Sequence, residues 1–250
     1  MQKPIAVVTG ASSGIGAATA RALAEDGFHV FCVARRTERI EALAAEIDGS
    51  AVTCDVSNPS AVASLTETVG DRVDLLVNNA GGALGKEPLT ETDLELWQRM
   101  YDSNVMGAAR VTQALLPALR AAEGQIAFVT SVAAETAYEG GGGYCGVKAA
   151  ERMLAGSLRL ELAGEPIRIC EIVPGLVKTE EFSLTRFDGD QERADKEYEG
   201  VEGPLVAEDI AECIRWVASR PWHVNIDRMV VRPRAQAAMH KLIRSAPEQG

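Results

Sequence analysis

Short apolar runs, often rich in β-branched residues, alternate along the chain with longer segments whose apolar positions recur at helical spacing. Apolar runs of this length, bounded by turn residues, are typical of strands buried on both faces of a parallel sheet. Seven such runs predict strands, over residues 5–9, 28–34, 51–54, 74–77, 125–130, 167–173 and 226–231. The segments between them predict helices, over residues 17–25, 37–47, 59–69, 92–123, 144–162 and 205–219. Strands that alternate with helices predict one α/β domain over residues 1–250, with a doubly wound parallel seven-stranded sheet covered by helices on both faces.

Two stretches interrupt this regular alternation. The long helix over 92–123 contains Asn104, and an asparagine inside a helix competes for backbone hydrogen bonds and often marks a kink. Residues 180–203 are polar and charged with poor periodicity. A segment this long in a compact domain is usually a functional lid or a disordered loop. We therefore expect a substrate-loop insertion at about 176–205.

A glycine-rich turn joins the first strand to the first helix, where residues 9–16 read TGASSGIG. The order strand, glycine turn, helix is the context in which such a motif binds a nucleotide phosphate, as in Rossmann-like folds. The helix N-terminus offers free N–H groups, glycines allow close approach of the backbone, and Ser12 and Ser13 add hydroxyl donors. A tight turn without a ligand is the alternative, which the TGxxxGxG spacing disfavours.

The end of the second strand bears on the choice of cofactor. A carboxylate near this point binds the ribose 2′-OH of NAD, whereas an arginine accommodates the 2′-phosphate of NADP. Ala34 stands where the acid is expected, and Arg35 and Arg36 follow it. The sequence therefore predicts NADP(H), with a pair of surface arginines as the alternative. Asp55, after the third strand, either accepts from an adenine amino group or caps the next helix.

Three residues near the middle of the chain are candidates for proton transfer. Tyr144 and Lys148 are four residues apart and share one face of a helix. A cation close to a phenol favours the phenolate, which makes the tyrosine a usable proton donor and acceptor. Ser131 ends the buried fifth strand just before them. A Tyr and a Lys at this spacing are usually helix surface, so the pair gains weight only from its context.

Asparagines at two further positions are candidates for the same site. Asn78 and Asn79 follow the fourth strand, and we expect them both to tie neighbouring backbones together and to line the cofactor cleft. Asn104 is a candidate to hold a water molecule, with a simple helix irregularity as the alternative.

Composition excludes several functional classes. The 250 residues are 46% apolar and carry a formal net charge of -11, which argues against nucleic acid or an anionic membrane as partner. Residues 228–244 are locally basic, and we interpret them as solvated or inter-subunit charge. Five cysteines without a CxxC pair and three scattered histidines indicate reduced thiols and no metal site. We find no signal peptide and no membrane-length apolar run, and expect a cytoplasmic protein.

Together these residues resemble the short-chain dehydrogenase/reductase family over nearly the whole chain. The matching motifs are Thr9-Gly10-x-x-x-Gly14-Ile15-Gly16, Asp55, Asn78-Asn79-Ala80-Gly81, Asn104, Ser131, Tyr144-x-x-x-Lys148 and Pro174-Gly175. The resemblance implies a catalytic tetrad of Asn104, Ser131, Tyr144 and Lys148, and a homotetramer. It also implies NADP binding by Gly10, Ser12, Ser13, Gly14, Ile15, Arg35, Arg36, Asp55, Val56, Asn79, Ala80, Gly81, Tyr144, Lys148, Pro174, Gly175, Val177 and Thr179.

A narrower resemblance concerns the substrate. Residues 174–187, with Pro221 and residues 223–226, are similar to the branch of NADP-dependent 3-hydroxy acid dehydrogenases, which includes L-allo-threonine/serine dehydrogenases and semialdehyde reductases. Two departures, Ala134 where a glycine is common and the glycine-rich loop 139–143, bear on the shape of the pocket.

The resemblance implies hydride transfer between NADP(H) and a small substrate. Tyr144 and Ser131 act on the substrate oxygen, Lys148 binds the nicotinamide ribose, and Asn104 holds a water molecule. Arg186 is our candidate for binding the substrate carboxylate, with a solvated loop arginine as its alternative. The other functions considered are reduction of a 3-ketoacyl thioester or bulky ketone, and a non-catalytic NADP sensor. Cys145 is interpreted as packing because no histidine partner is evident.

Overall fold

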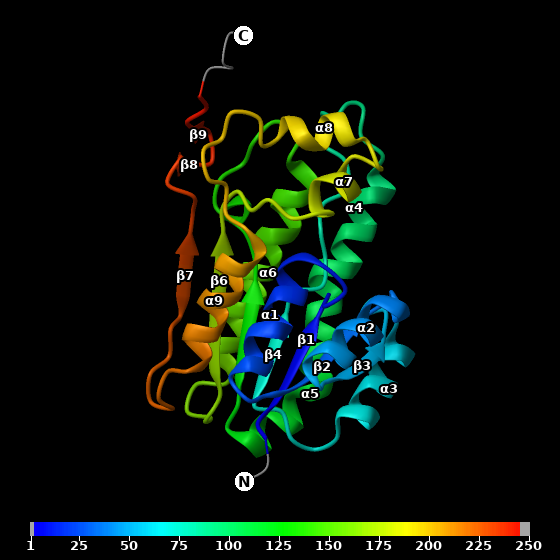
Figure 1. Ribbon diagram of the computed structural model, residues 1–250, viewed down its shortest axis with the longest axis vertical. Helices are drawn as coiled ribbons and strands as arrows, with labels where there is room; N and C mark the ends of the chain where they lie inside the picture. The colour runs from blue at the N-terminus through cyan, green and yellow to red at the C-terminus, as the bar shows by residue number, and fades with distance from the viewer. Residues whose placement is uncertain (1–2, 246–250) are drawn as a thin grey trace.

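Seven parallel strands form the central sheet, in the spatial order β3-β2-β1-β4-β5-β6-β7 (Figure 1). The computed structural model describes residues 3–245. The strands are β1 (Ile5–Thr9), β2 (His29–Ala34), β3 (Ser50–Thr53), β4 (Leu75–Asn78), β5 (Gln125–Val129), β6 (Arg168–Pro174) and β7 (Arg228–Val231). All seven predicted strands are confirmed, and their ends move by at most two residues.

The strand order reverses at β1, which pairs with β2 on one side and with β4 on the other. Val7, for example, lies opposite Phe31 of β2 and Leu76 of β4. In an open α/β sheet, the crevice at such a switch point, beyond the carboxyl ends of the strands, is where ligands bind. The glycine-rich turn after β1 and the asparagines after β4 both lie at this end of the sheet.

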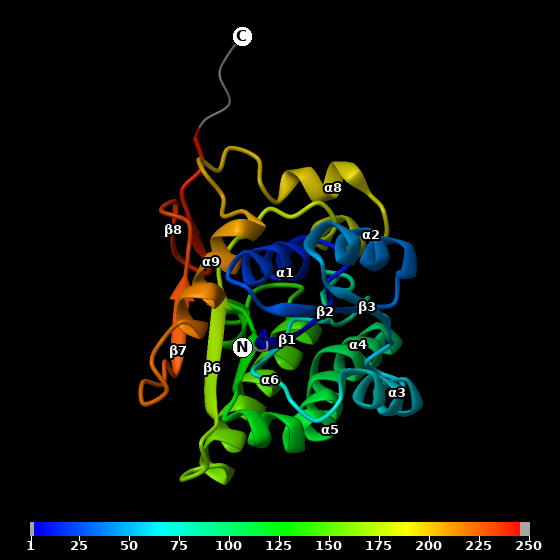
Figure 2. The ribbon, with the colours of Figure 1, turned by 60° about the horizontal axis from the view of Figure 1, so that its bottom comes forward.

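Helices cover both faces of the sheet (Figure 2). They are α1 (Gly14–Glu25), α2 (Thr37–Ile47), α3 (Pro59–Val69), α4 (Leu94–Met100), α5 (Gly107–Ala122), α6 (Gly142–Glu161), α7 (Phe182–Arg186), α8 (Gln191–Lys196) and α9 (Ala207–Ala218). Buried side chains of α1, α2 and α9 share one hydrophobic cluster, and those of α3, α5 and α6 share the other. This is the Rossmann-like, doubly wound arrangement that the sequence predicts.

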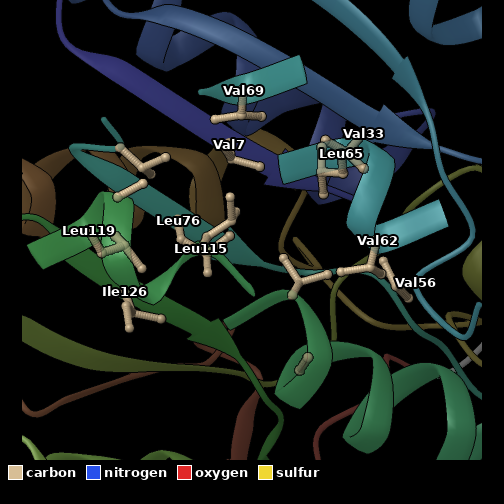
Figure 3. Close-up of a cluster of buried hydrophobic side chains, with 14 of the residues drawn as sticks. Val7, Val33, Val56, Val62, Leu65, Val69, Leu76, Leu115, Leu119 and Ile126 are labelled. Carbon is tan, nitrogen blue, oxygen red and sulfur yellow. The ribbon is translucent and has the colours of Figure 1, made fainter. Parts of the chain in front are cut away.

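Alternation along the strands divides the core into these two clusters. On β1, Val7 faces the α3–α5 side, whereas Ala6 and Val8 face the α1–α9 side. Figure 3 shows the first cluster, where Val7, Leu76 and Leu115 lie between the sheet and the helices. Both sides are apolar because helices cover both, which explains why the strands read as continuous apolar runs.

The predicted interruption of the long helix is present. A six-residue π-helical turn, Tyr101–Met106, separates α4 from α5. The side-chain amide of Asn104 donates to the Met100 carbonyl at 2.8 Å, so it competes with the regular backbone ladder as expected. This wide turn directs Asn104 toward the loop after β4.

The segment after β6 is folded over the carboxyl end of the sheet, so the alternative of a disordered loop is wrong. It contains α7 and α8, which the poor periodicity did not predict. A short hairpin, β8 (Gln236–Ala238) and β9 (Lys241–Leu242), was also not predicted. The side chain of Gln236 accepts from the backbone N–H of Leu176 at 2.9 Å, and thereby holds the start of this segment.

The basic residues near the C-terminus are mostly engaged within the subunit. Arg228 forms ion pairs with Glu135 and Glu171, and Arg244 donates to the carbonyl of Glu197 at 3.0 Å. Arg228 is therefore partly buried in ion pairs within the subunit rather than solvated, whereas Arg244 is exposed, as expected for solvated charge; the inter-subunit alternative stays a prediction. Within residues 3–245, no helix has both the length and the apolar character that a membrane span needs.

Candidate active site

The glycine-rich turn adopts a conformation that only glycines tolerate well. Gly10 and Gly14 have positive φ angles of 70° and 51°. A Cβ atom on Gly16 would lie 2.3 Å from the Gly10 carbonyl oxygen, so the start of α1 packs directly onto the turn. The N–H groups at this helix end are therefore free to face a phosphate.

Asn79, directly after β4, fixes the turn from the other side, and Asn78, the last residue of β4, ties that strand to α5. The Asn79 side chain donates to the Thr9 carbonyl at 3.0 Å, and its backbone N–H donates to the Thr9 hydroxyl at 3.0 Å. The Asn78 side chain donates to the buried Thr112 hydroxyl at 2.8 Å. Both residues thus tie neighbouring segments together, as predicted.

Arg36 reaches across to the glycine-rich turn. Its guanidinium donates to the hydroxyls of Ser12 and Ser13, each at 2.8 Å. The same guanidinium pairs with Glu181 at 2.7 Å, and Arg39 pairs with that carboxylate as well. Burial opposes ionisation of Glu181, but hydrogen bonds from Arg36 and Ser13 together hold the pKa of this carboxyl below its ordinary value.

This donor set fits the 2′-phosphate expected for NADP(H). Two guanidinium groups and two hydroxyls surround one carboxylate, and phosphate oxygens accept the same kinds of hydrogen bond. Arg35 is exposed and makes no hydrogen bond within residues 3–245. The sequence singled out both arginines equally, and only Arg36 lies in this donor set.

Asp55 lies at the carboxyl end of the sheet, where one of its oxygens accepts from the backbone N–H and the hydroxyl of Ser57 at 2.9 and 2.7 Å. It does not cap α3, because the Asn58 side chain does so. The alternative of a helix cap at Asp55 is therefore wrong, and its second oxygen forms no hydrogen bond in the described part of the chain.

The remaining candidates for cofactor contact lie around the same crevice. Ile15 packs against two hydrophobic clusters, and both contain side chains of α1 and α9. Val56 packs against Gly107. The backbone N–H of Ala80 donates to the Thr9 hydroxyl at 3.0 Å. Pro174 ends β6, Gly175 adjoins Gln236, Val177 pairs with Leu205, and Thr179 lies next to Gly14. Gly81, with a φ of 143°, packs so closely against Asn104 that a Cβ atom would lie 2.4 Å from its side-chain oxygen.

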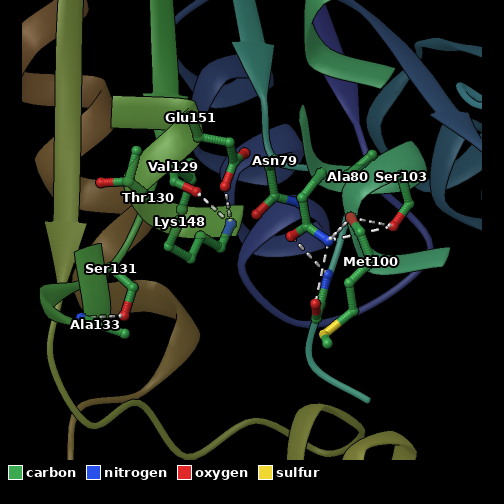
Figure 4. A network of polar contacts seen from close by, with 12 residues as sticks. Asn79, Ala80, Met100, Ser103, Val129, Thr130, Ser131, Ala133, Lys148 and Glu151 are labelled. Atoms are coloured by element: carbon green, nitrogen blue, oxygen red, sulfur yellow. Dashed lines mark hydrogen bonds and ion pairs between the residues drawn. The ribbon is translucent and has the colours of Figure 1, made fainter. Parts of the chain in front are cut away.

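The four residues of the expected tetrad come from three elements and are all buried. Tyr144 and Lys148 lie on α6, and the Lys148 Nζ atom is 5.9 Å from the centre of the Tyr144 ring. Lys148 donates to the Val129 carbonyl at 3.2 Å, two residues before Ser131 (Figure 4). Asn104 reaches the loop after β4 from the π-helical turn and accepts from the Gly82 N–H at 3.1 Å.

Sequence reasoning missed a fifth polar side chain here, the carboxylate of Glu151. Its carboxylate lies 2.6 Å from the Lys148 Nζ atom, and the two side chains are only 2% and 7% exposed. Burial opposes the charged form of Lys148, but the charges of Glu151 and Tyr144 and the hydrogen bond to Glu151 raise its pKa. Burial raises the pKa of Glu151 to about 7, against the opposing influence of Lys148. The spacing of three residues on one helix was the available signal.

Arg186 lies inside the site rather than in solvent, at 7% exposure. Its guanidinium donates to the Gly85 carbonyl at 3.1 Å and to the Tyr138 hydroxyl at 2.8 Å. The Cζ atom lies 5.7 Å from the centre of the Tyr144 ring. Burial raises the pKa of Tyr138 to about 12, although Arg186 opposes this shift, so both acceptors of Arg186 are neutral. Within residues 3–245 no carboxylate forms an ion pair with Arg186.

Neither thiol nor metal chemistry gains support. Burial raises the pKa of the Cys145 thiol, which disfavours the reactive thiolate and agrees with a packing role. Cys32, Cys54 and Cys170 are buried free thiols. Across residues 3–245, no three His, Cys, Asp or Glu side chains gather in a way that suits a metal ion.

Comparison with known proteins identifies relatives along almost the whole chain. The family described as short chain dehydrogenase matches residues 4–187. An uncharacterized oxidoreductase of Mycobacterium tuberculosis is 56% identical over 238 residues, which cover 95% of this chain and 94% of that protein. Serine 3-dehydrogenase of Agrobacterium fabrum is 43% identical over 234 residues, 91% of this chain and 92% of that protein. The closed form of a serine dehydrogenase complexed with NADP+ has a TM-score of 0.91 at 35% identity, covering 97% of this chain and all of that chain.

Proposed function

Since the chain belongs to the short chain dehydrogenase family and is an NADP-dependent oxidoreductase that acts on a CH–OH group, we propose that it oxidises a small 3-hydroxy acid, or reduces the corresponding semialdehyde or 3-oxo acid. Serine, the substrate that names one of its relatives, is a 3-hydroxy acid. The proposal adds to the family assignment a substrate that carries a carboxylate as well as a carbinol.

Arg186 carries this proposal. A buried cation whose partners are neutral is expected to bind an anionic group, because burial without a counter-ion is costly. The guanidinium lies close to the Tyr144 ring, so an anion bound there would hold its carbinol near the phenol. A guanidinium binds a carboxylate through two parallel hydrogen bonds, which also fixes orientation.

The cofactor-binding residues fit NADP(H), with the Arg36 donor set for the 2′-phosphate and the glycine-rich turn for the pyrophosphate. The nicotinamide supplies or accepts the hydride. Lys148 binds the nicotinamide ribose. Three further residues are proposed to line the cofactor site: Ile15 of α1, Asn79 after β4 and Thr179 after β6.

Within the proposed tetrad, Tyr144 donates a proton to the substrate oxygen during reduction and accepts one during oxidation. Ser131 hydrogen-bonds the same oxygen and orients it. Lys148 stabilises the phenolate through its charge, since its ammonium is close to the ring. Asn104 holds the π-helical turn against Gly82 and is proposed to order a water molecule that exchanges protons with Lys148.

Two alternatives are less well supported. A 3-ketoacyl thioester or a bulky ketone needs an open apolar cleft, whereas the space beside Tyr144 contains a buried cation and the edge of Phe182, 5.7 Å away between ring centres. A non-catalytic NADP sensor has no need for a buried Ser131, Tyr144 and Lys148 together.

We also propose a homotetramer, which the family resemblance implies, and a cytoplasmic location, which the free cysteines support. Met153 and Leu160 on α6 are 65% and 80% exposed, and apolar residues of this kind suit a helix that packs between subunits.

The proposal is tested by NADP+ reduction with L-serine, L-allo-threonine, 3-hydroxyisobutyrate and 3-hydroxypropionate beside simple secondary alcohols. Turnover is expected for the acids. Arg186→Ala should lower kcat/KM for the acids by about 10- to 100-fold, because charge-assisted hydrogen bonds are lost. Its effect on uncharged alcohols should be small. Equal losses for acids and alcohols would show that Arg186 does not bind the carboxylate.

Two control variants complete this test. Arg193→Ala changes an exposed arginine of α8 in the same loop and should leave the preference for acids unchanged. Tyr144→Phe should abolish turnover while leaving NADPH binding intact. Turnover of alcohols but of none of the acids would contradict the 3-hydroxy acid proposal and leave the reductase assignment standing.

A further inference from the structure

Glu151 is an unusual group to find beside the proposed catalytic lysine. It lies one helical turn after Lys148 on the same face of α6, and the residue is 1% exposed. Glutamate is almost never fully buried unless it is paired. Its partner here is Lys148, whose Nζ atom lies 2.6 Å from the carboxylate (Figure 4). Because the Glu151 carboxylate is enclosed by the protein, it is held in one place. The Lys148 ammonium that it binds is held in place as well.

The surroundings leave Lys148 as the cation that Glu151 binds. β5 contributes the Val129 carbonyl, which accepts from the same ammonium. β6 contributes Glu171, which accepts from the Thr130 hydroxyl at 2.8 Å and pairs with Arg228 at 3.2 Å; its negative charge contributes to the raised pKa of Glu151. β6 also carries Arg168, which donates to the Arg220 carbonyl at 2.9 Å, and Cys170, a buried thiol whose pKa is raised by burial. Glu135 forms ion pairs with Arg152, Arg228 and Arg232, and Glu95, Arg99, Tyr101 and Asp102 lie at or near the surface.

The ion pair with Glu151 determines whether the Lys148 side chain is charged. An ammonium removed from water tends to release its proton unless a negative group compensates for the lost hydration. Lys148 is 5% exposed, so the protein must supply that compensation. Its other permanent contact, the Val129 carbonyl, is a neutral dipole and compensates less than a full negative charge.

We propose that Glu151 is a positioning residue that fixes the Lys148 side chain and keeps it charged throughout the alkaline range in which Tyr144 accepts the substrate proton. This inference rests on the roles proposed above for Tyr144 and Lys148. It assigns to Glu151 an effect that is transmitted through Lys148, without contact to substrate or cofactor.

Two electrostatic effects of removing the Glu151 charge oppose each other. The negative charge repels a phenolate at Tyr144, so its loss favours the phenolate. Loss of the Glu151 charge also favours the neutral form of Lys148. A neutral Lys148 no longer stabilises the phenolate of Tyr144. The Lys148 Nζ atom lies 5.9 Å from the ring centre, and the carboxylate that pairs with it at 2.6 Å comes from Glu151, almost one helical turn further from Tyr144 along α6. Because Coulomb interactions fall with distance, the loss of the nearer cation dominates once Lys148 deprotonates.

The first test is the pH profile of Glu151→Gln, which keeps the shape of the side chain and removes its charge. At pH 6 to 7, Lys148 stays protonated in both proteins, so oxidation rates should differ little. Above the lowered pKa of Lys148, the ratio of variant to wild-type kcat should fall about tenfold per pH unit, as the ammonium fraction does. A purely structural role would give the same relative loss at every pH.

A second readout needs neither cofactor nor substrate. The titration of Lys148 is followed by NMR in cofactor-free protein labelled with ¹³C at the lysine ε-carbon, with Lys148→Arg to assign the signal. Glu151→Gln should lower the pKa of Lys148 by two units or more, within the range known for buried lysines. An unchanged Lys148 titration would overturn the proposal. Because this readout is independent of turnover, it decides the matter even if none of the tested acids is a substrate.

Matched variants guard against a loss of folding. Glu161→Gln changes an exposed glutamate on the same helix and should leave both the pH profile and the Lys148 titration unchanged. Glu151→Asp retains the charge on a shorter side chain and should restore most of the alkaline activity. If Glu151→Gln does not fold, Glu151→Met takes its place, because it removes the carboxylate from a side chain of similar length. A wild-type pH profile and Lys148 titration in Glu151→Met would refute the proposal.

Discussion

Three cationic side chains of the site differ in the groups that they bind. Lys148 faces the fixed carboxylate of Glu151, and Arg36 faces the carboxylate of Glu181, which is carried by the loop after β6. Arg186 faces only neutral oxygens. We propose that these differences separate their functions: the Lys148–Glu151 pair stays in place, the Glu181 contact is exchanged for the 2′-phosphate, and Arg186 binds an anionic substrate group.

Arg36 should discriminate between the two nicotinamide cofactors. Arg36→Ala removes a charged donor that fits the 2′-phosphate, so the Kd for NADP+ should rise by about 10- to 100-fold while that for NAD+ changes little. Calorimetric titration of both cofactors measures this directly. Arg21→Ala, which breaks an exposed pair with Glu46 at 2.7 Å, is the control. Equal weakening of both cofactors would show that Arg36 does not bind the 2′-phosphate.

At the residue scale, the sequence predicts groups that belong to ordered motifs and misses groups that depend on burial. Tyr144, Lys148, Ser131 and Asn104 could be proposed as a tetrad because they occupy motif positions of the family that the sequence resembles, in the context of predicted strands and helices. Glu151 could not, since a glutamate at helical spacing is usually solvated, and only the fold shows that this face of α6 is covered.

At the scale of elements, helix ends explain much of the local order. The Asn58 side chain accepts from the backbone N–H groups of Ser60 and Ala61, and Pro59 occupies the first helical position of α3. Both features are typical of a helix start, and the predicted bounds of this helix agree with the observed ones.

Asn58→Ala should destabilise the protein without affecting its activity. The loss of an N-cap costs about 1 kcal/mol, which lowers Tm by about 2–4 °C in a protein of this size. Thermal unfolding followed by circular dichroism is the measurement, and Asn58→Asp, which keeps an accepting oxygen, should behave like wild type. A fall in turnover at unchanged Tm would mean that Asn58 has a role in the site.

The elements that sequence reasoning missed are the short ones. β8 has three residues and β9 has two, too few for any period to be visible. The helices α7 and α8 have five and six residues and are held by contacts from the loop after β4: the Gly85 N–H donates to the Arg186 carbonyl at 2.9 Å, and Glu87 pairs with Arg193 at 3.2 Å. Long strands and helices carry their own pattern, whereas these segments depend on the rest of the fold.

At the scale of the whole molecule, the residues proposed to bind the cofactor come from segments spread along the chain. They lie in the turn after β1, the loop after β4, α6 and the segment after β6. A ligand that binds across them can bind only the folded chain, so its binding energy adds to the stability of the whole domain.

NADP+ should therefore raise the temperature of global unfolding. At 100 times Kd the gain is about 2.7 kcal/mol, equivalent to about 5–10 °C in Tm. Scanning fluorimetry over a range of NADP+ concentrations measures it, and NAD+ at the same concentrations should give a smaller shift. An unchanged Tm at saturating NADP+ would contradict a crevice assembled in this way.

The hairpin β8–β9 has a consequence for the timing of activity during synthesis. Gln236 holds Leu176, and the backbone of Ser245 donates to the Gly200 carbonyl at 2.7 Å, so both ends of the loop over the site are tied by residues near the C-terminus. A nascent chain leaves the ribosome from its N-terminus, and the sheet strands β1 to β6 emerge before these anchors. The crevice for the cofactor can therefore form before the loop that carries Arg186 is secured, and a chain that stops short of residue 236 should fold its sheet while its substrate loop lacks these anchors.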